Sequence, residues 1–493
     1  MTHADTPPTR PGHRTLLLLA GPAAYLLVLL VAPAALAPAA RQALGIGAWM
    51  AVWWIAEAVP LAATSLLPLA LFPLLGVTSA REAAAPYANE LVFLFLGGFL
   101  LATALAQWNA HQRIAFSILA AIGVGPRRVV FGVMAATAFV SMWISNTATA
   151  AMMYPIALAI GALAADDADG RALRTSLMLG VAYAASIGGM ATLVGTPPNL
   201  IFAGAARELV GREVDFARFM AVGLPVALVL LPTCWALLVF VLHRSRATLG
   251  AGAGSVVAER RRALGPLRGG ERRTIAVFAL TALAWLFREP KDLGAVQVPG
   301  LTQLAPGVTD ASIAIAAAVL LFVLPGRTRQ GEVRPLITWP EARRIPWDAL
   351  LLFGGGLSLA AAMESTGLAR WLGTLMEGLA GAPTPVLFAG IATAVLLLSE
   401  VGSNTAVAAM AMPVAAALGQ AVGQPPLVLM LVAALAASTG FALPIATPPN
   451  TIVFGSGQVT VRQMMRAGLL LDAISIVVVA LAVWLLAPWV GFT

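Results

Sequence analysis

The sequence predicts an all-α polytopic membrane protein with about eleven transmembrane helices, two re-entrant hairpins and an inverted repeat. Three observations carry this prediction: an apolar composition, two long uncharged segments with polar centres, and motifs that recur at a nearly constant spacing. Of the 493 residues, 60% are apolar and only 11% are charged, whereas a soluble domain is roughly 25% charged. The single cysteine, Cys234, excludes an intrachain disulfide.

The net charge of +8 comes from arginines that concentrate in short connectors between the apolar segments. A nucleic-acid-binding protein would gather its basic residues on one face of a soluble domain. Arginine-rich connectors instead follow the positive-inside rule. They predict a multi-pass protein of the cell (inner) membrane with a cytoplasmic N-terminus, an external C-terminus and no nucleic-acid partner.

Eleven apolar segments are long enough to be candidate spans. The first is too long for the roughly 7–15-residue apolar core of a signal peptide, so we interpret it as a retained helix. The predicted spans are Thr15–Ala40, Ile46–Val59, Leu61–Leu75, Leu91–Val124, Thr175–Phe202, Met220–Leu242, Ile275–Phe287, Ala311–Leu324, Leu350–Leu375, Leu427–Phe454 and Ala467–Val490.

Two further uncharged segments, 129–165 and 383–420, do not fit as single spans. Each is interrupted near its middle by Ser-Asn-Thr, at residues 145–147 and 403–405. Because non-helical backbone at membrane depth must be buried or line a wet cavity, both segments are predicted to be re-entrant hairpins with polar tips.

The two halves of the chain share three ordered motifs. Leu-Phe-Leu-Gly-Gly at 94–98 matches Leu-Phe-Gly-Gly-Gly at 352–356, an offset of 258 (353 − 95). The Ser-Asn-Thr triplets have the same offset (403 − 145 = 258), and the two Thr-Pro-Pro-Asn motifs are 251 apart (447 − 196). An odd number of crossings between the copies makes the repeat inverted, an architecture common in transporters.

The repeat divides the chain into an N-terminal tail with the first helix, two copies and a basic linker. Broken helices are expected where Thr-Pro-Pro-Asn occurs. The predicted regions are the tail and first helix (1–40), repeat 1 (41–242, with broken helix 175–215), a cytoplasmic linker (243–274) and repeat 2 (275–493, with broken helix 427–460).

The polar breaks predict a binding site for small ions. Proline interrupts a helix because it lacks an N–H and its ring opposes the carbonyl four residues back. Freed N–H groups and helix N-termini favour anions, whereas freed carbonyls and hydroxyls can ligate a hard cation such as Na⁺. Breaks can also be simple kinks, and Ser, Asn and Thr can join neighbouring helices. Four paired breaks favour a shared site.

Acids inside apolar segments are functional candidates. Glu400 precedes the second triplet and is expected either to orient that tip or to pair with nearby backbone or an arginine. Glu57 and Asp472 are expected near span ends, and Glu364 is the remaining candidate. An integral-membrane enzyme is disfavoured because none of the four histidines lies near the repeated motifs, and a continuous channel is disfavoured by interrupted helices.

The motifs resemble the divalent anion:sodium symporter family, which carries dicarboxylates, citrate or sulfate. The resemblance covers both repeats, and its last motif is similar to the family's signature. The matching segments are WISNTATAAMM (143–153), GTPPN (195–199), EVGSNTA (400–406) and STGFALPIATPPNTIVFGSG (438–457).

Position by position, the resemblance implies two groups of site residues. Substrate carboxylates would be bound by Asn146, Thr147, Thr196, Asn404, Thr405 and Thr447. One sodium ion would be held by Ser141, Ser145, Asn146 and Gly195, and the other by Ser399, Gly402, Asn404 and Ala446. No catalytic residue and no organic cofactor are implied.

The resemblance also implies a mechanism, in which a transport domain moves like an elevator against a scaffold that forms a homodimer. The expected function is sodium-coupled transport of divalent anions, first of all C4-dicarboxylates such as succinate. The family also contains sodium-independent exchangers and sulfate transporters, and these alternatives stay open.

Overall fold

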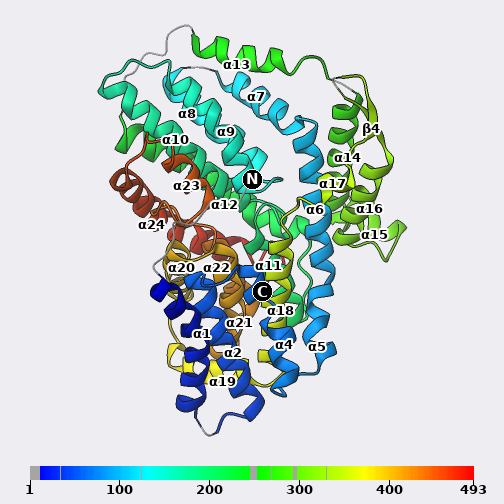
Figure 1. Cartoon of the computed structure of the whole chain (residues 1–493), viewed down its shortest axis with the longest axis vertical. Helices are drawn as coiled ribbons and strands as arrows, with labels where there is room; N and C mark the ends of the chain where they lie inside the picture. The colour runs from blue at the N-terminus through cyan, green and yellow to red at the C-terminus, as the bar shows by residue number, and fades with distance from the viewer. Residues whose placement is uncertain are drawn as a thin grey trace.

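The computed structural model describes residues 11–33, 35–123, 125–244, 252–267, 269–292, 297–328 and 330–492. The N-terminal tail 1–10, part of the predicted basic linker (245–251 and 268) and Thr493 lie outside the described residues. The described part of the chain is almost entirely helical (Figure 1).

The first half contains α1 Pro11–Val31, α2 Pro38–Ala56, α3 Leu61–Thr64, α4 Leu67–Leu74, α5 Ala80–Ala84, the 3₁₀ turn η1 Ala85–Ala88, α6 Glu90–Gln107, α7 Ala110–Ile122, α8 Pro126–Ser141, α9 Asn146–Gly161, α10 Ala168–Gly189, α11 Pro197–Val210, α12 Phe216–Ala236 and the π-helical segment η2 Leu237–Leu242. In Figure 1, α6 runs along one flank of the molecule, whereas α8, α9 and α10 lie together at one end.

The second half contains α13 Gly252–Ala263, α14 Gly269–Leu286, α15 Leu301–Leu304, α16 Asp310–Val323, α17 Trp339–Ala342, α18 Trp347–Ser365, α19 Leu368–Met376, the 3₁₀ turn η3 Glu377–Leu379, α20 Thr384–Val401, α21 Asn404–Val422, α22 Pro426–Ala436, α23 Pro448–Phe454 and α24 Val461–Leu486. Two short antiparallel hairpins pair β1 Lys291–Asp292 with β2 Gln297–Val298, and β3 Pro325–Arg327 with β4 Val333–Pro335.

Five helical segments among the described residues are long and apolar enough to cross a membrane, or up to six if bent pairs are included. They are Ala80–Gln107, Phe216–Leu242, Thr384–Val401, Asn404–Val422 and Val461–Leu486, with α18 and its continuation as the bent pair. Both arms of the second predicted hairpin are in this set, so its re-entrant character and the total of eleven spans stay predictions.

Two predicted spans are each two helices rather than one. Leu91–Val124 divides into α6 and α7 at Asn109, whose φ is 56°. Leu350–Leu375 divides into α18 and α19 at Gly367, whose φ is 77°, and the chain bends there by 78°. Both breaks use left-handed backbone, which interrupts a right-handed helix. They are 258 residues apart (367 − 109), so the repeat includes these bends.

Two boundaries in the N-terminal region also differ from prediction. The first predicted span, Thr15–Ala40, is shorter in the structure, since α1 ends at Val31. The predicted span Leu61–Leu75 contains the separate helices α3 and α4. Hydropathy marks both regions as apolar, but it does not register where the backbone leaves the helix.

Pairs of equivalent glycines anchor the long helices of the two repeats. A Cβ added to Gly97 on α6 would lie 2.6 Å from Ala314 on α16, and one added to Gly355 on α18 would lie 2.4 Å from the carbonyl oxygen of Ser65. The two glycines are 258 residues apart (355 − 97). In both repeats a missing side chain therefore allows close helix packing.

The repeats also pack across one another. The half-helix α11 from the first repeat lies against α21 and α22, and α23 from the second lies against α9 and α10 (Figure 1). The rings of Tyr183 on α10 and Phe441 before α23 meet at 5.3 Å between centroids. This crossed packing brings the two broken helices together in the interior.

We predict that Gly188→Ala destabilises the protein, because its Cβ would lie 2.2 Å from the carbonyl oxygen of Ala138 on α8. Such overpacking costs about 1–3 kcal/mol. Thermal unfolding of the purified protein in detergent should show a lower melting temperature. The matched control is Gly390→Ala on α20, where an added Cβ meets nothing within 4 Å. Equal melting temperatures for the two variants would contradict this packing.

Candidate functional site

All four predicted polar breaks interrupt helices in the structure. The first triplet lies where α8 ends and α9 begins, and the second where α20 ends and α21 begins. The helix containing the first Thr-Pro-Pro-Asn divides into α10 and α11, and the helix containing the second divides into α22 and α23. Proline begins both α11 and α23, where its missing N–H costs no helical hydrogen bond.

Three oxygen atoms converge at the first hairpin tip. The hydroxyl oxygen of Ser141 lies 2.8 Å from Oδ1 of Asn146 and 2.7 Å from the main-chain oxygen of Ala185 on α10. One hydroxyl proton can be donated to only one of these acceptors at a time. A group of oxygens in excess over protons is the ligand set that a hard cation prefers.

Glycines allow the backbone of the broken helix to approach this tip. A Cβ added to Gly189 would lie 2.4 Å from Oδ1 of Asn146, and one added to Gly195 would lie 2.4 Å from the carbonyl oxygen of Gly189. The structure therefore brings Ser141, Asn146 and the Gly195 loop together, as the sequence predicts. Only glycine fits this close approach of backbone to side chain.

The asparagine of each Thr-Pro-Pro-Asn motif holds the unwound loop before it. The side-chain amide of Asn199 donates to the carbonyls of Gly189 (3.0 Å) and Thr192 (2.7 Å). Asn450 does the same in the second repeat. Its amide donates to Gly440 (3.4 Å) and Leu443 (2.9 Å), the positions 251 residues further on. Both asparagines are fully buried.

The second hairpin tip has a similar arrangement with fewer recorded contacts. The hydroxyl of Ser399 donates to the carbonyl of Ala437 (2.9 Å). A Cβ added to Gly440 would lie 3.3 Å from both the Ser399 carbonyl oxygen and the Cβ of Ala446. Oδ1 of Asn404 is buried without a hydrogen-bond partner in the described part of the chain. Ser399 and Ala446 are therefore neighbours, and Asn404 has a free acceptor.

The remaining predicted site residues are placed less closely. Ser145 is exposed and caps α9 by accepting from the Ala148 N–H. Thr196 and Thr447 are buried, and Thr447 accepts from the Asn450 N–H. The others are exposed or half-buried: Thr147, Gly402 and Thr405. Within the described ranges, no hydrogen bond joins a Ser-Asn-Thr residue of one repeat to one of the other.

Glu400 has a backbone-organising role. Its two carboxylate oxygens accept from the N–H groups of Ala442 and Leu443, each at 2.8 Å. Of the two expectations for Glu400, pairing with nearby backbone is the one that the structure contains. The equivalent position in repeat 1 is Met142 (400 − 258), whose carbonyl accepts from the Thr192 hydroxyl. The repeats thus secure equivalent loops with different groups.

Asp472 was expected near a span end, and this is wrong. It lies within α24, is only 3% exposed, accepts from the Phe441 N–H at 3.2 Å, and is within hydrogen-bonding reach of Glu400. The capping box of Thr460 and Gln463 starts α24 at Val461 and could have placed Asp472 in the helix interior. Glu57 does lie at the end of α2.

The electrostatics of the breaks rest on main-chain groups. In the described ranges, no Lys, Arg or His forms an ion pair with a residue of either triplet. The helices α9, α11 and α21 begin at the breaks, so their N-terminal N–H groups and positive dipole ends lie there. An anion at this place would be stabilised by dipoles, amides and bound cations.

Comparison with known proteins identifies the family. Residues 13–492 match the family described as the sodium:sulfate symporter transmembrane region. The chain belongs to this family. The resemblance to divalent anion:sodium symporters is thereby confirmed, and a transporter rather than an enzyme is established.

A curated relative and two solved structures are similar to this family member. The sodium-dependent dicarboxylate transporter SdcS of Staphylococcus aureus is 39% identical over 479 residues, covering 96% of this chain and 91% of SdcS. The YdaH transporter of Alcanivorax borkumensis has a TM-score of 0.52 at 16% identity, covering 85% of this chain and 87% of its own. MtrF of Neisseria gonorrhoeae also has a TM-score of 0.52, at 14% identity, covering 93% and 97%. These last two likenesses concern the fold alone.

We predict that Glu400→Gln loosens the 437–447 loop. A glutamine amide offers one acceptor oxygen instead of two, and its NH₂ group would oppose one of the two N–H donors. Loss of one buried hydrogen bond should lower the hydrogen-exchange protection of Ala442 and Leu443 about tenfold. Hydrogen–deuterium exchange mass spectrometry measures this change. Glu364→Gln, at an exposed position, is the control; if both variants protect the loop equally, Glu400 does not hold it.

Proposed function

We propose that this protein is a sodium-coupled secondary transporter of divalent anions, with C4-dicarboxylates such as succinate as its first substrates. The observation that carries the proposal is the oxygen cluster of Ser141, Asn146 and the Ala185 carbonyl at a helix break. The second repeat contains a related break, and the family is that of sodium:sulfate symporters. The similarity to a sodium-dependent dicarboxylate transporter supports this substrate class.

Two sodium ions, the only cofactors proposed, would occupy equivalent places in the two repeats. One would be held by Ser141, Ser145, Asn146 and the Gly195 region, and the other by Ser399, Gly402, Asn404 and Ala446. The close approach of Gly189 to Asn146 supports the first site, and the unpartnered Oδ1 of Asn404 supports the second. Hydroxyl, amide and carbonyl oxygens suit a hard monovalent cation.

The dianion would lie between the tips, with its carboxylates bound by Asn146, Thr147, Thr196, Asn404, Thr405 and Thr447. No arginine pairs with the triplets in the described ranges, so bound sodium would supply the positive charge. Two sodium ions neutralise a dianion and also organise the side chains that bind it. Sodium would therefore bind before the substrate.

The movement proposed for transport is of the elevator type in a homodimer. The two hairpins and two broken helices would move together against a scaffold that contains α6 and α18. The glycine contacts that these helices make with Ala314 and Ser65 support a rigid scaffold. The N-terminus would be cytoplasmic and the C-terminus external in the cell (inner) membrane, with the hairpins entering from opposite faces.

We predict that replacing Na⁺ by K⁺ or choline reduces succinate uptake into proteoliposomes by tenfold or more. The reason is that the substrate site has no fixed positive side chain to replace the cation. Unchanged uptake would exclude symport and favour sodium-independent exchange. Competition by succinate, α-ketoglutarate, citrate and sulfate against one labelled anion identifies the substrate class, and preference for sulfate would contradict the dicarboxylate assignment.

We predict that Asn146→Ala and Asn404→Ala each abolish transport while the protein still inserts and folds. Each substitution removes one amide shared between a sodium site and the substrate site. Uptake and thermal unfolding should be measured together, with Gln424→Ala beyond α21 as a control outside the site. Near-normal uptake by both asparagine variants would defeat the site assignment.

A further inference from the structure

The two repeats are packed unequally against the long helices. On α11, a Cβ added to Gly204 would lie 2.6 Å from the ring of Phe353 and 3.2 Å from Leu357, both on α18. The half-helix of repeat 1 thus sits directly on the long helix of repeat 2. Such close contact is available only to glycine.

The equivalent contact in the other direction is absent. By the offsets of the repeats, Gly204 corresponds to Gly455 (204 + 251), and Phe353 and Leu357 correspond to Phe95 and Phe99 on α6. Gly455 is exposed, and an added Cβ would meet only two carbonyl oxygens of its own turn, at 3.4 Å. Phe99 remains half-buried. A glycine at the matching position therefore has no matching partner.

A second pair of positions shows the same inequality. Val194, in the loop of the first broken helix, lies 3.5 Å from a Cβ added to Gly98 on α6. Its equivalent is Ile445 (194 + 251), which is 74% exposed. The equivalent of Gly98 is Gly356, which instead faces Ala409 on α21 at 2.8 Å. Exposure of a large apolar side chain in an otherwise packed loop indicates a contact made in another state.

The packing within the proposed scaffold has no such inequality. Gly97 and Gly355 make equivalent close contacts, with Ala314 and Ser65. The differences therefore concern only the contacts between the broken helices or hairpins and the long helices. This is the distribution expected if one part moves as a unit and the other stays fixed.

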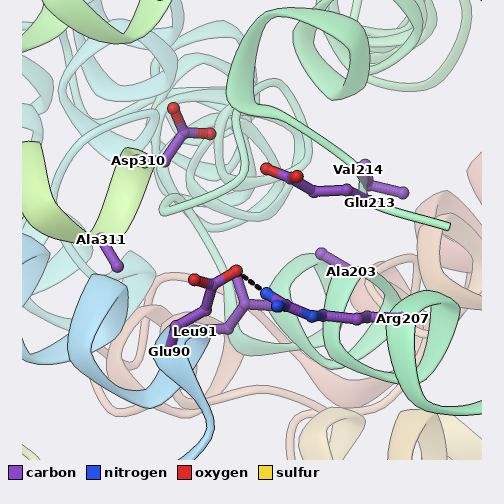
Figure 2. A pocket seen from close by; sticks show the side chains of 8 residues that line it. All are labelled: Glu90, Leu91, Ala203, Arg207, Glu213, Val214, Asp310 and Ala311. Carbon is purple, nitrogen blue, oxygen red and sulfur yellow. Dashed lines mark hydrogen bonds and ion pairs between the residues drawn. The ribbon is translucent and has the colours of Figure 1, made fainter. Parts of the chain in front are cut away.

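An ion pair closes the side on which α11 is docked. Arg207 on α11 pairs with Glu90 on α6, and Figure 2 shows the two side chains pointing toward one another. Beside them, the Asn89 amide donates to Glu208 at 2.9 Å. The equivalents of Arg207 and Glu90 are Gln458 and Asp348, which form no ion pair in the described ranges.

We propose that the opposite conformation exchanges these contacts between the repeats. In that state Gly455 would dock on Phe95 and Phe99 of α6, and Ile445 would pack against Gly356 of α18. At the same time α11 would leave α18, and the pair of Arg207 and Glu90 would separate. This assignment of docking residues rests on the proposed elevator function, and it concerns positions that touch neither substrate nor sodium.

A bulky residue at Gly455 should arrest the protein in the conformation described here. Gly455→Leu fits this conformation, because the position is exposed and its φ of −59° suits any residue, but it blocks close docking on Phe99. Uptake should fall at least tenfold relative to Gly307→Leu, a control at an open glycine. Sodium-dependent binding of succinate should remain. Equal uptake by the two variants would overturn the docking assignment.

Disulfide trapping tests the same contact without substrate, so its outcome is independent of the transported anion. In a Cys234→Ala background, Phe99→Cys with Gly455→Cys should cross-link under oxidant, since a disulfide needs Cα atoms within about 7 Å. Each single variant should not cross-link, and reductant should restore mobility. Glu90→Cys with Arg207→Cys is the positive control for the described state. A control that cross-links beside a Phe99–Gly455 pair that never does, with or without Na⁺ and succinate, would overturn the proposal.

Discussion

Every feature of the site depends on giving hydrogen-bond partners to backbone that has left the helix in a buried, apolar setting. An unpaired peptide group in such a place costs several kcal/mol. In each repeat one asparagine amide donates to two loop carbonyls, Asn199 in the first and Asn450 in the second. The loops are thereby held open without regular structure. Their remaining oxygens and helix N-termini stay available for ions.

The second repeat adds two buried carboxyl groups to this arrangement. Glu400 and Asp472 together accept from the N–H groups of Phe441, Ala442 and Leu443. In repeat 1, the Thr192 hydroxyl bonds a carbonyl at the position equivalent to Glu400. Duplication therefore preserved the course of the backbone, while the groups that stabilise it diverged. The two sodium sites proposed here would share geometry but differ in the charge that surrounds them.

The same duplication explains why exposed and buried glycines both matter. Gly97 and Gly355 support fixed contacts, since both repeats use them alike. Gly204 and Gly455 are equivalent in sequence, yet only Gly204 has a partner. A fold made of two inverted copies can occupy two related states by exchanging which copy is docked. Contacts between the moving and fixed parts must then be close enough to seal one side but weak enough to separate.

The sequence by itself determined the helical membrane architecture, the repeat and the four polar breaks, because hydropathy, proline chemistry and spacing are local properties. It also indicated Ser141, Asn146 and Gly195 as neighbours through resemblance. Only the tertiary structure revealed the bends at Asn109 and Gly367, the burial of Asp472 and the loop-holding role of Asn199. Each of these depends on a partner distant in sequence or on a single backbone dihedral, and an average over apolar residues contains neither.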